Sequence, residues 1–269
     1  MRYYTLYAVL FGEPVGVGMK GRSNAYYALI EALRQPGCPV CQQVDQAVRQ
    51  RIDAFLYEQI IVVARRDEIR EARGFCSVHG SMISGTGRMQ GTAILQHDVL
   101  NDVLREINKS AAVPVPTGAG KGRSLVSLKN WVATGLRLRP FGAIANAIKP
   151  RRECPLCEYE RDTEANMLRA LANNLDDEPL RESFAKSNGL CLSHFRVAMS
   201  GLSEVKPELL AVLTEIQLTL MTRLRDELAD YIHKSNGSYD YTSMGEESDA
   251  PLRAVRMVSG RVLNRDGRL

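Results

Sequence analysis

Hydrophobic residues recur at intervals of three and four along most of the chain, and this spacing predicts helices. Three long runs, at 44–63, 94–107 and 209–232, place their apolar residues on one helical face. The last run begins after Pro207, a favoured first-turn residue, and reaches about His233. Its helix would be roughly 40 Å long at 1.5 Å per residue. We therefore expect an all-α fold.

A shorter helix is expected near the start of the chain. Ser23 or Asn24 can cap it, and Pro36 and Gly37 end it after about Arg34. The residues predicted to face the core in the first three helices are Tyr27, Ile30 and Leu33, then Val44, Val48, Ile52, Phe55, Leu56 and Val63, then Ile94, Leu95, Val99, Leu100, Val103, Leu104 and Ile107. The third stripe is wide, so we expect that helix to be buried.

All six cysteines occur in a repeated pattern with two histidines. A C-P-x-C motif is followed after 34 residues by the cysteine of G-F-C-S-V-H, and a second C-P-x-C is followed after 33 residues by the cysteine of G-L-C-L-S-H. The two copies are offset by 116 residues at the first pair and 115 at the second, which indicates an internal duplication. The pairs are Cys38 with Cys41, Cys76 with His79, Cys154 with Cys157, and Cys191 with His194.

Three thiols and one imidazole are the ligands of a closed, structural zinc site. The residues between the two pairs of a copy divide into two helices of roughly 14 residues, about 20 Å each, so the hairpin would return to its start. Each hairpin is then expected to close around its own zinc ion, giving two ions in all. The spacing leaves open the exchanged pairing, in which Cys38 and Cys41 meet Cys191 and His194. An iron-sulfur cluster on the same ligands, or a redox switch that releases the metal, are the chemical alternatives.

Composition is that of an ordinary globular protein. The chain has 269 residues, of which 45% are hydrophobic and 25% charged. We find no apolar run of about 18 residues or more, so no transmembrane segment is expected. The opening residues lack a small-residue cleavage site, which argues against a signal peptide. We expect a cytoplasmic protein with reduced thiols that bind metal rather than form disulfides.

The excess of basic over acidic residues lies entirely in one segment of the chain. Residues 111–152 hold eight Lys and Arg residues and no acidic residue; the rest of the chain has 27 basic against 31 acidic residues, a net charge of −4. Within it, an apolar face from Leu125 to Leu136 includes Trp131. A solvated tether is one interpretation; a contact with nucleic acid, a membrane surface or an acidic protein groove is the other. The candidate contact residues are Lys121, Arg123, Lys129, Trp131, Arg137, Arg139, Arg151 and Arg152.

The C-P-L-C motif together with R-E-S-F-A-K-S-N-G-L-C-L-S-H-F resembles an uncharacterised bacterial family, a domain of unknown function with duplicated C-P-x-C and G-[FL]-C-x-x-H motifs. Met244-Gly245-Glu246-Glu247-Ser248-Asp249, followed by Arg253-Ala254, resembles the closing motif of that family. The resemblance covers most of residues 24–260. It implies an intracellular helical protein with paired metal ligands, and it implies no activity.

The expected organisation is a pair of zinc-stapled helical hairpins packed on long amphipathic helices. Its parts are an extension at 1–22, a first metal unit at 23–110, the basic linker at 111–152, a second metal unit at 153–234 and a polar tail at 235–269, with a short helix around Leu252 to Val258. The function expected from these features is a non-enzymatic scaffold or adaptor with an unknown protein partner. An iron-sulfur or thiol redox protein, and a nucleic-acid-binding protein that uses the linker, are the alternatives.

Overall fold

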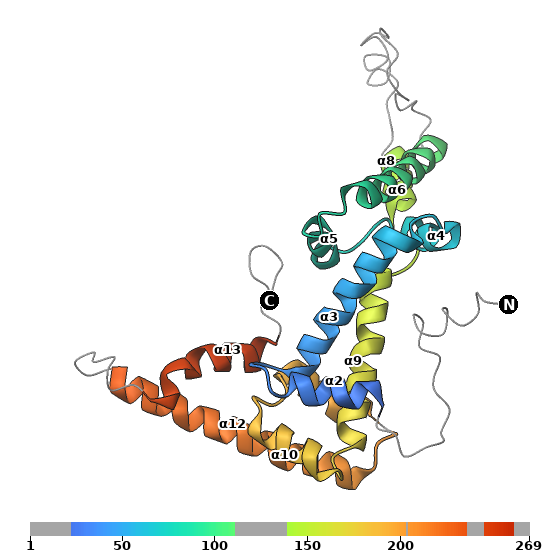
Figure 1. Cartoon of the computed structure of the whole chain (residues 1–269). Coiled ribbons are helices and arrows are strands. Elements are labelled where there is room, and N and C mark those ends of the chain that lie inside the picture. The colour runs from blue at the N-terminus through green and yellow to red at the C-terminus, as the bar shows by residue number, and fades with distance from the viewer. Residues whose placement is uncertain (1–22, 111–138, 203, 236–244, 261–269) are drawn as a thin grey trace, which may run out of the picture.

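The expected all-α architecture is confirmed (Figure 1). The computed structural model describes residues 23–110, 139–202, 204–235 and 245–260, and these form eleven α-helices and no strand. The first half contains α2 (Asn24–Ala32), α3 (Pro39–Ala54), the π-helical turn η1 (Phe55–Gln59), α4 (Val63–Glu71), α5 (Ser77–Ser84) and α6 (Met89–Ser110). The second contains α8 (Arg139–Ile148), α9 (Pro155–Asn173), α10 (Glu178–Lys186), α11 (Leu192–Gly201), α12 (Pro207–Ser235), the 3-10 turn η3 (Glu246–Asp249) and α13 (Ala250–Ser259).

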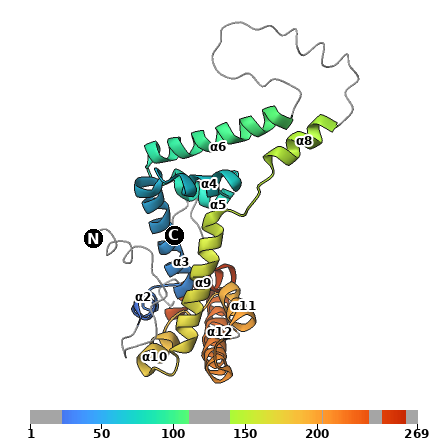
Figure 2. The ribbon, with the colours of Figure 1, turned by 90° about the vertical axis from the view of Figure 1, so that its right-hand side faces the viewer.

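The centre of the molecule is the antiparallel pair of α3 and α9, which lie side by side in both ribbon views (Figures 1 and 2). The apolar positions predicted for α3 are buried, including Val48 and Ile52, and they meet Leu168 and Leu171 in one continuous core. Val63, which was assigned to the same face, is exposed because it begins α4 after the chain has turned. Each half of the sequence therefore contributes one helix to a shared core.

The expected division of each hairpin into two equal helices is wrong. The outgoing helix α3 has 16 residues and continues through the five residues of η1, whereas the returning helix α4 has nine. In the second half α9 has 19 residues and α10 has nine. At 1.5 Å per residue the outgoing helices span about 30 Å and the returning ones about 13 Å. Neither returning helix is long enough to carry its chain back to the start of the outgoing helix.

Helix α2 forms where it was predicted, and the prediction of its core-facing residues is confirmed in part. The Ser23 side chain caps it by accepting a hydrogen bond from the Tyr26 amide at 3.3 Å. Tyr26, not Tyr27, is buried, and its hydroxyl donates to the Asp177 carboxylate in the other half of the chain. Tyr27 is 58% exposed. The predicted Leu33 is buried, so the face differs from the prediction at Tyr27 and not along its whole length.

Helices α6 and α8 pack on each other and extend from the top of the body (Figure 2). Leu95 and Val99 of α6 are buried, but Leu100 is 59% exposed, so only part of the wide stripe reaches the core. The Arg73 guanidinium joins this arm to the body by donating to the Asp102 carboxylate and to the Ala147 carbonyl oxygen at 2.7 Å. The expectation that the whole helix is buried is therefore wrong.

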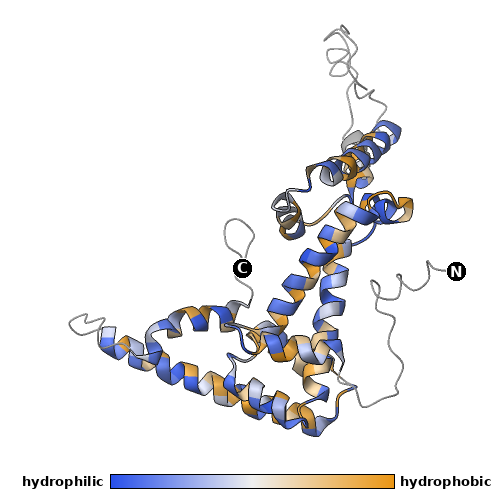
Figure 3. Cartoon of the chain, in the orientation of Figure 1, coloured by the Kyte–Doolittle hydropathy of each residue, from blue (hydrophilic) through white to orange (hydrophobic). Residues whose placement is uncertain are grey.

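The long helix α12 runs along the lower edge of the body and contacts α9, α10 and α13 (Figure 1). The short helix expected around Leu252 to Val258 lies within α13. Polar residues interrupt the apolar ones along α12 (Figure 3). Among the described helices, none has the length and apolar character needed to cross a bilayer.

Candidate metal centres

The four Cys and His pairs of the sequence meet in two clusters. In each cluster the four ligand atoms lie within 4.8 Å of one another. Both clusters join segments that are far apart in the sequence. Site 1 consists of Cys38, Cys41, Cys191 and His194, and site 2 consists of Cys76, His79, Cys154 and Cys157.

The hairpins do not close around their own ligands, so that expectation is wrong, and the exchanged pairing is the one found. Each site takes one pair from each half of the chain. The geometry of the helices explains the exchange. Because α3 and η1 together are much longer than α4, the chain reaches Cys76 at the far end of α3, where the antiparallel α9 begins with Cys154. The same mismatch between α9 and α10 delivers Cys191 to the start of α3.

Every ligand pair lies at the beginning of a helix. Cys38, Cys76, Cys154 and Cys191 are the N-cap residues of α3, α5, α9 and α11, and the second ligand follows three residues later in the first turn. Two helix N-termini therefore converge on each site. Their unpaired amides and partial positive charge favour thiolates over thiols. The proline after each of the two C-P-x-C cap residues is pre-set for a first helical turn.

The interatomic distances in site 1 are close to those of a tetrahedron around one ion. The His194 Nδ1 atom lies 3.4 Å from Cys38 Sγ, 3.4 Å from Cys41 Sγ and 3.2 Å from Cys191 Sγ. The sulfur atoms of Cys41 and Cys191 are 3.7 Å apart. A tetrahedral zinc ion with Zn–S near 2.3 Å and Zn–N near 2.0 Å sets its sulfur atoms about 3.8 Å apart and sulfur about 3.5 Å from nitrogen.

Site 2 has the same dimensions. The His79 Nδ1 atom lies 3.2 Å from Cys76 Sγ, 3.4 Å from Cys157 Sγ and 3.7 Å from Cys154 Sγ. The sulfur atoms of Cys76 and Cys157 are 3.6 Å apart. A disulfide needs about 2.05 Å, and all six cysteines are free. All four ligands of site 1 are buried, whereas Cys76 and Cys157 in site 2 are partly exposed.

Both imidazoles turn their second nitrogen toward a carboxylate of α9. His194 Nε2 lies 3.1 Å from Glu164 Oε1, and His79 Nε2 lies 3.4 Å from Glu160 Oε2. A carboxylate at Nε2 places the proton there and leaves Nδ1 free to bind a metal. One helix thus places a carboxylate beside the second nitrogen of both histidines, in hydrogen-bonding geometry at His194 and at ion-pair distance only at His79. These two glutamates were not identified from the sequence, where acidic residues on a helix are too common to be informative.

The pKa values within site 1 show how strongly its groups interact. Burial would lower the pKa of His194, but hydrogen bonds with Cys191, Cys38 and Glu164 outweigh it and raise the pKa to about 12. Hydrogen bonds from Cys38 and Cys41 hold the pKa of Cys191 well below its usual value, while those to Cys191 and Cys38 raise that of Cys41. One thiolate is thus stabilised while its neighbour keeps its proton. A divalent cation would displace these protons and hold three thiolates together.

In site 2 the pKa values of two cysteines again shift in opposite directions, and by less than in site 1. Burial would lower the pKa of His79, but hydrogen bonds with Cys154 and Glu160 raise it to about 10. Burial would raise the pKa of Cys154, but hydrogen bonds from His79 and from backbone amides lower it to about 6. Burial and the Cys76 sulfur raise the pKa of Cys157. The two sites therefore share their chemistry as well as their shape.

The comparisons with known proteins place this architecture in one family. A family model described as "Family of unknown function (DUF6062)" matches residues 28–265, which include both sites and most of the chain. The chain belongs to this family. No curated protein and no solved structure matches the chain. Membership of the DUF6062 family therefore supports the resemblance seen in the sequence and leaves the function to be argued from the structure.

A further positioning residue of this DUF6062 protein is Gln217, which is fully buried in α12. Its amide forms two hydrogen bonds with the Leu190 backbone, at 2.8 Å to the N–H and 2.9 Å to the carbonyl. Leu190 directly precedes the site 1 ligand Cys191. Gly189 has a positive φ of 74°, and a Cβ there would lie 2.9 Å from Gln217 Oε1. The only sequence signal for Gln217 is a polar residue within the apolar stripe of α12.

Most of the candidate contact residues of the basic linker fall outside the part of the chain that the structure describes. Lys121, Arg123, Lys129, Trp131 and Arg137 lie outside the described residues, as does the side chain of Arg139, and the extension at 1–22 does too. Residues 139–148 form α8. Arg151 pairs with Glu106 at 2.9 Å, and Arg152 pairs with Glu158 at 2.8 Å. These two arginines thus have partners within the chain.

Proposed function

We propose that this protein is a non-enzymatic helical scaffold whose two halves are fastened together by two structural zinc ions. The observation that carries the proposal is the gathering of eight ligand atoms into two sets with tetrahedral spacing. Four protein ligands close the coordination sphere of zinc, which is the mark of a structural site. The ion in site 1 would connect α3 of the first half with α11 of the second. The ion in site 2 would connect α5 with α9.

Zinc suits these sites better than the iron-sulfur alternative. Thiolate-rich tetrahedral sets select zinc or iron-sulfur centres. A cluster, however, binds its ligands to different iron atoms, which spreads the donor atoms over more than one coordination sphere. Ligand atoms that all lie within 4.8 Å fit a single ion. Visible absorption near 400 nm in anaerobically purified protein would favour iron, because zinc is colourless.

Metal analysis of protein expressed in its own host tests the proposal. We expect two zinc ions per chain and no stoichiometric iron. Complete chelation should lower the helicity and the melting temperature together, because the binding free energy of a structural ion contributes to folding. Unchanged helicity and melting temperature after both ions have been removed would contradict a structural role.

Single-site variants assign the ions. Cys41→Ser should reduce the zinc content from two to one per chain, and Cys154→Ser should do the same through the other site. Ser193→Ala is the matched control, because Ser193 is exposed and lies between the site 1 ligands Cys191 and His194. It should retain two zinc ions. Two ions in both cysteine variants would show that the thiols are not the ligands.

The partner of the proposed scaffold stays a prediction. Nucleic-acid binding through the basic linker predicts a steep loss of affinity with rising salt, because each neutralised phosphate releases counterions. The measurement is a titration of the full chain with duplex and single-stranded oligonucleotides between 50 and 200 mM salt, roughly the range over which such complexes weaken by orders of magnitude. A flat salt response would exclude this mode and leave a membrane surface or an unidentified protein as the partner.

A further inference from the structure

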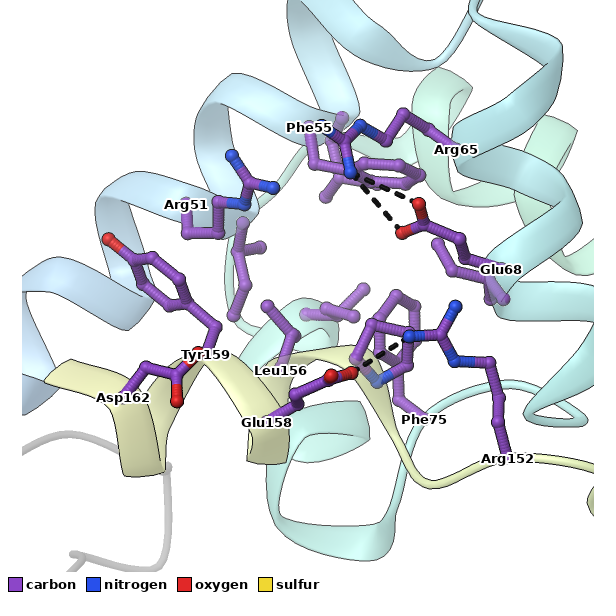
Figure 4. A pocket seen from close by; sticks show the side chains of 15 residues that line it. Arg51, Phe55, Arg65, Glu68, Phe75, Arg152, Leu156, Glu158, Tyr159 and Asp162 are labelled. Carbon is purple, nitrogen blue, oxygen red and sulfur yellow. Dashed lines mark hydrogen bonds and ion pairs between the residues drawn. The ribbon is translucent and has the colours of Figure 1, made fainter. Parts of the chain in front are cut away.

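A cavity of about 250 Å³ lies where the two halves meet, beside site 2 (Figure 4). It is enclosed by α3 and η1 on one side, by α4 and α5, and by the first turns of α9. Its inner wall is apolar and buried, formed by Ile52, Phe55, Leu56, Ile69, Ile83 and Leu156. Leu156 lies between the ligands Cys154 and Cys157. We call this cavity the arginine pocket, after the residues at its mouth.

Three arginines surround the mouth, and two of them are neutralised. Arg65 pairs with Glu68 at 3.1 Å, and Arg152 pairs with Glu158 at 2.8 Å. The third is Arg51, whose guanidinium stacks over the Tyr159 ring at 5.4 Å from its centroid.

Among the described residues, no carboxylate lies within 4.0 Å of the Arg51 guanidinium. Asp162 also lines the pocket, at its edge beside Tyr159 (Figure 4). The lining holds three arginines and three acidic residues, and Arg51 is the one of these arginines that has no ion-pair partner among the lining residues; it is held against an aromatic ring at the mouth of the cavity. Planar guanidinium groups in this position bind carboxylates through two parallel hydrogen bonds.

We propose that the arginine pocket binds a small amphipathic carboxylate, with the apolar body inside and the carboxylate on Arg51. A cavity of 150 Å³ is known to hold benzene, so the arginine pocket has room for a larger apolar group, such as a medium-length acyl chain or a fused ring. An apolar wall with a few convergent polar groups is the usual form of a small-molecule site. The proposal does not depend on the identity of the metal.

The location gives such a ligand a structural effect. The pocket is walled by α3 and α4 of the first half and α9 of the second. Phe75, which directly precedes the ligand Cys76, also lines it. A molecule bound there contacts both halves at once and stabilises only the assembled protein, so it should raise the melting temperature by mass action.

Calorimetric titration of the full metal-loaded chain with octanoate tests the proposal. 1-Octanol and octylamine serve as matched probes with the same apolar body and a neutral or positive head. We expect octanoate to bind at a single site and raise the melting temperature, and each of the other two to bind at least tenfold more weakly, because neither has a carboxylate to accept charge-assisted hydrogen bonds from Arg51. Equal binding of octanoate and 1-octanol, or no octanoate binding up to millimolar concentration, would overturn the proposal.

Two variants locate the site. Arg51→Gln should weaken octanoate binding tenfold or more and leave 1-octanol unchanged, while Arg181→Gln, an exposed arginine of α10 far from the pocket, should change neither. Ile69→Phe should fill the cavity and abolish binding; its zinc content and helicity report whether it folds. Because Arg51 is not part of the apolar core, its variant remains informative if Ile69→Phe unfolds. Undiminished octanoate binding in Arg51→Gln would refute the assignment.

Discussion

At the scale of single residues, the two histidines differ from an ordinary buried imidazole in having a defined partner at each nitrogen. Nδ1 faces three sulfur atoms, and Nε2 faces a carboxylate of α9. The identity of the eight ligands was predictable, because cysteine and histidine pairs at this spacing are uncommon outside metal sites. Glu160, Glu164 and Gln217 were not predictable, since each acts through a contact between segments that are distant in sequence.

Removing the carboxylate behind His194 should weaken the metal without removing a ligand. We expect Glu164→Ala to lower the zinc affinity of site 1 by about 10-fold to 100-fold, the usual effect of losing the group that orients a metal-binding imidazole. Competition with a fluorescent chelator measures it. Glu215→Ala, on the exposed side of α12, is the control. Equal affinities in the two variants would show that Glu164 does not position His194.

The sulfur atoms of the two sites should react at different rates. Cys76 and Cys157 are partly exposed, whereas the three cysteines of site 1 are buried. Alkylation depends on access to the thiolate, so N-ethylmaleimide should modify site 2 first and release one zinc ion before the second. Peptide mass spectrometry over a time course gives the order. Faster labelling of Cys41 or Cys191 would contradict it, and equal labelling in denaturant is the control.

At the scale of secondary-structure elements, the pairing of ligands follows from helix length. The hydrophobic pattern identified the long helices and most of their buried residues, but it could not reveal that α3 continues into η1 while α4 stops after nine residues. The spacing of the ligands in the sequence is compatible with both pairings. The distance that the outgoing helix covers before it turns decides between them, and that depends on how α3 packs against α9.

The close approach of α6 to η1 gives a testable prediction at this scale. Gly91 of α6 passes so near η1 that a Cβ would lie 2.3 Å from the Leu56 carbonyl oxygen, a backbone atom that cannot rotate away. Gly91→Ala should therefore destabilise the protein by about 1–3 kcal/mol, the usual cost of overpacking. Gly142→Ala, in α8 with open space around it, should be neutral or stabilising, because alanine favours helices. Urea unfolding of both variants measures the difference.

At the scale of the whole molecule, the two halves are reciprocal. Each supplies one C-P-x-C pair and one Cys-His pair, and neither completes a site alone. The all-α class and the duplicated motif were visible in the sequence. The exchange of ligands between the halves was visible only as one of two possibilities.

Separating the halves should abolish tight metal binding. Residues 1–130 contain two ligands for each site, so this fragment should bind zinc weakly and lack a cooperative melting transition. Co-expressed fragments 1–130 and 131–269 should purify together and dissociate when a chelator is added. Size-exclusion chromatography with metal analysis follows both. Tight binding of one zinc ion by the isolated first fragment would instead support a hairpin that closes around its own ion.

Because each half supplies the ligands that the other half lacks, the two sites also bear on how chains assemble. Two copies of the chain that traded halves would satisfy every thiol and imidazole as well as one copy folded on itself. Coordination chemistry therefore does not distinguish a monomer from a domain-swapped dimer. The effective concentration that the connecting segment gives one half in the presence of the other, set by the length of that segment, decides the outcome.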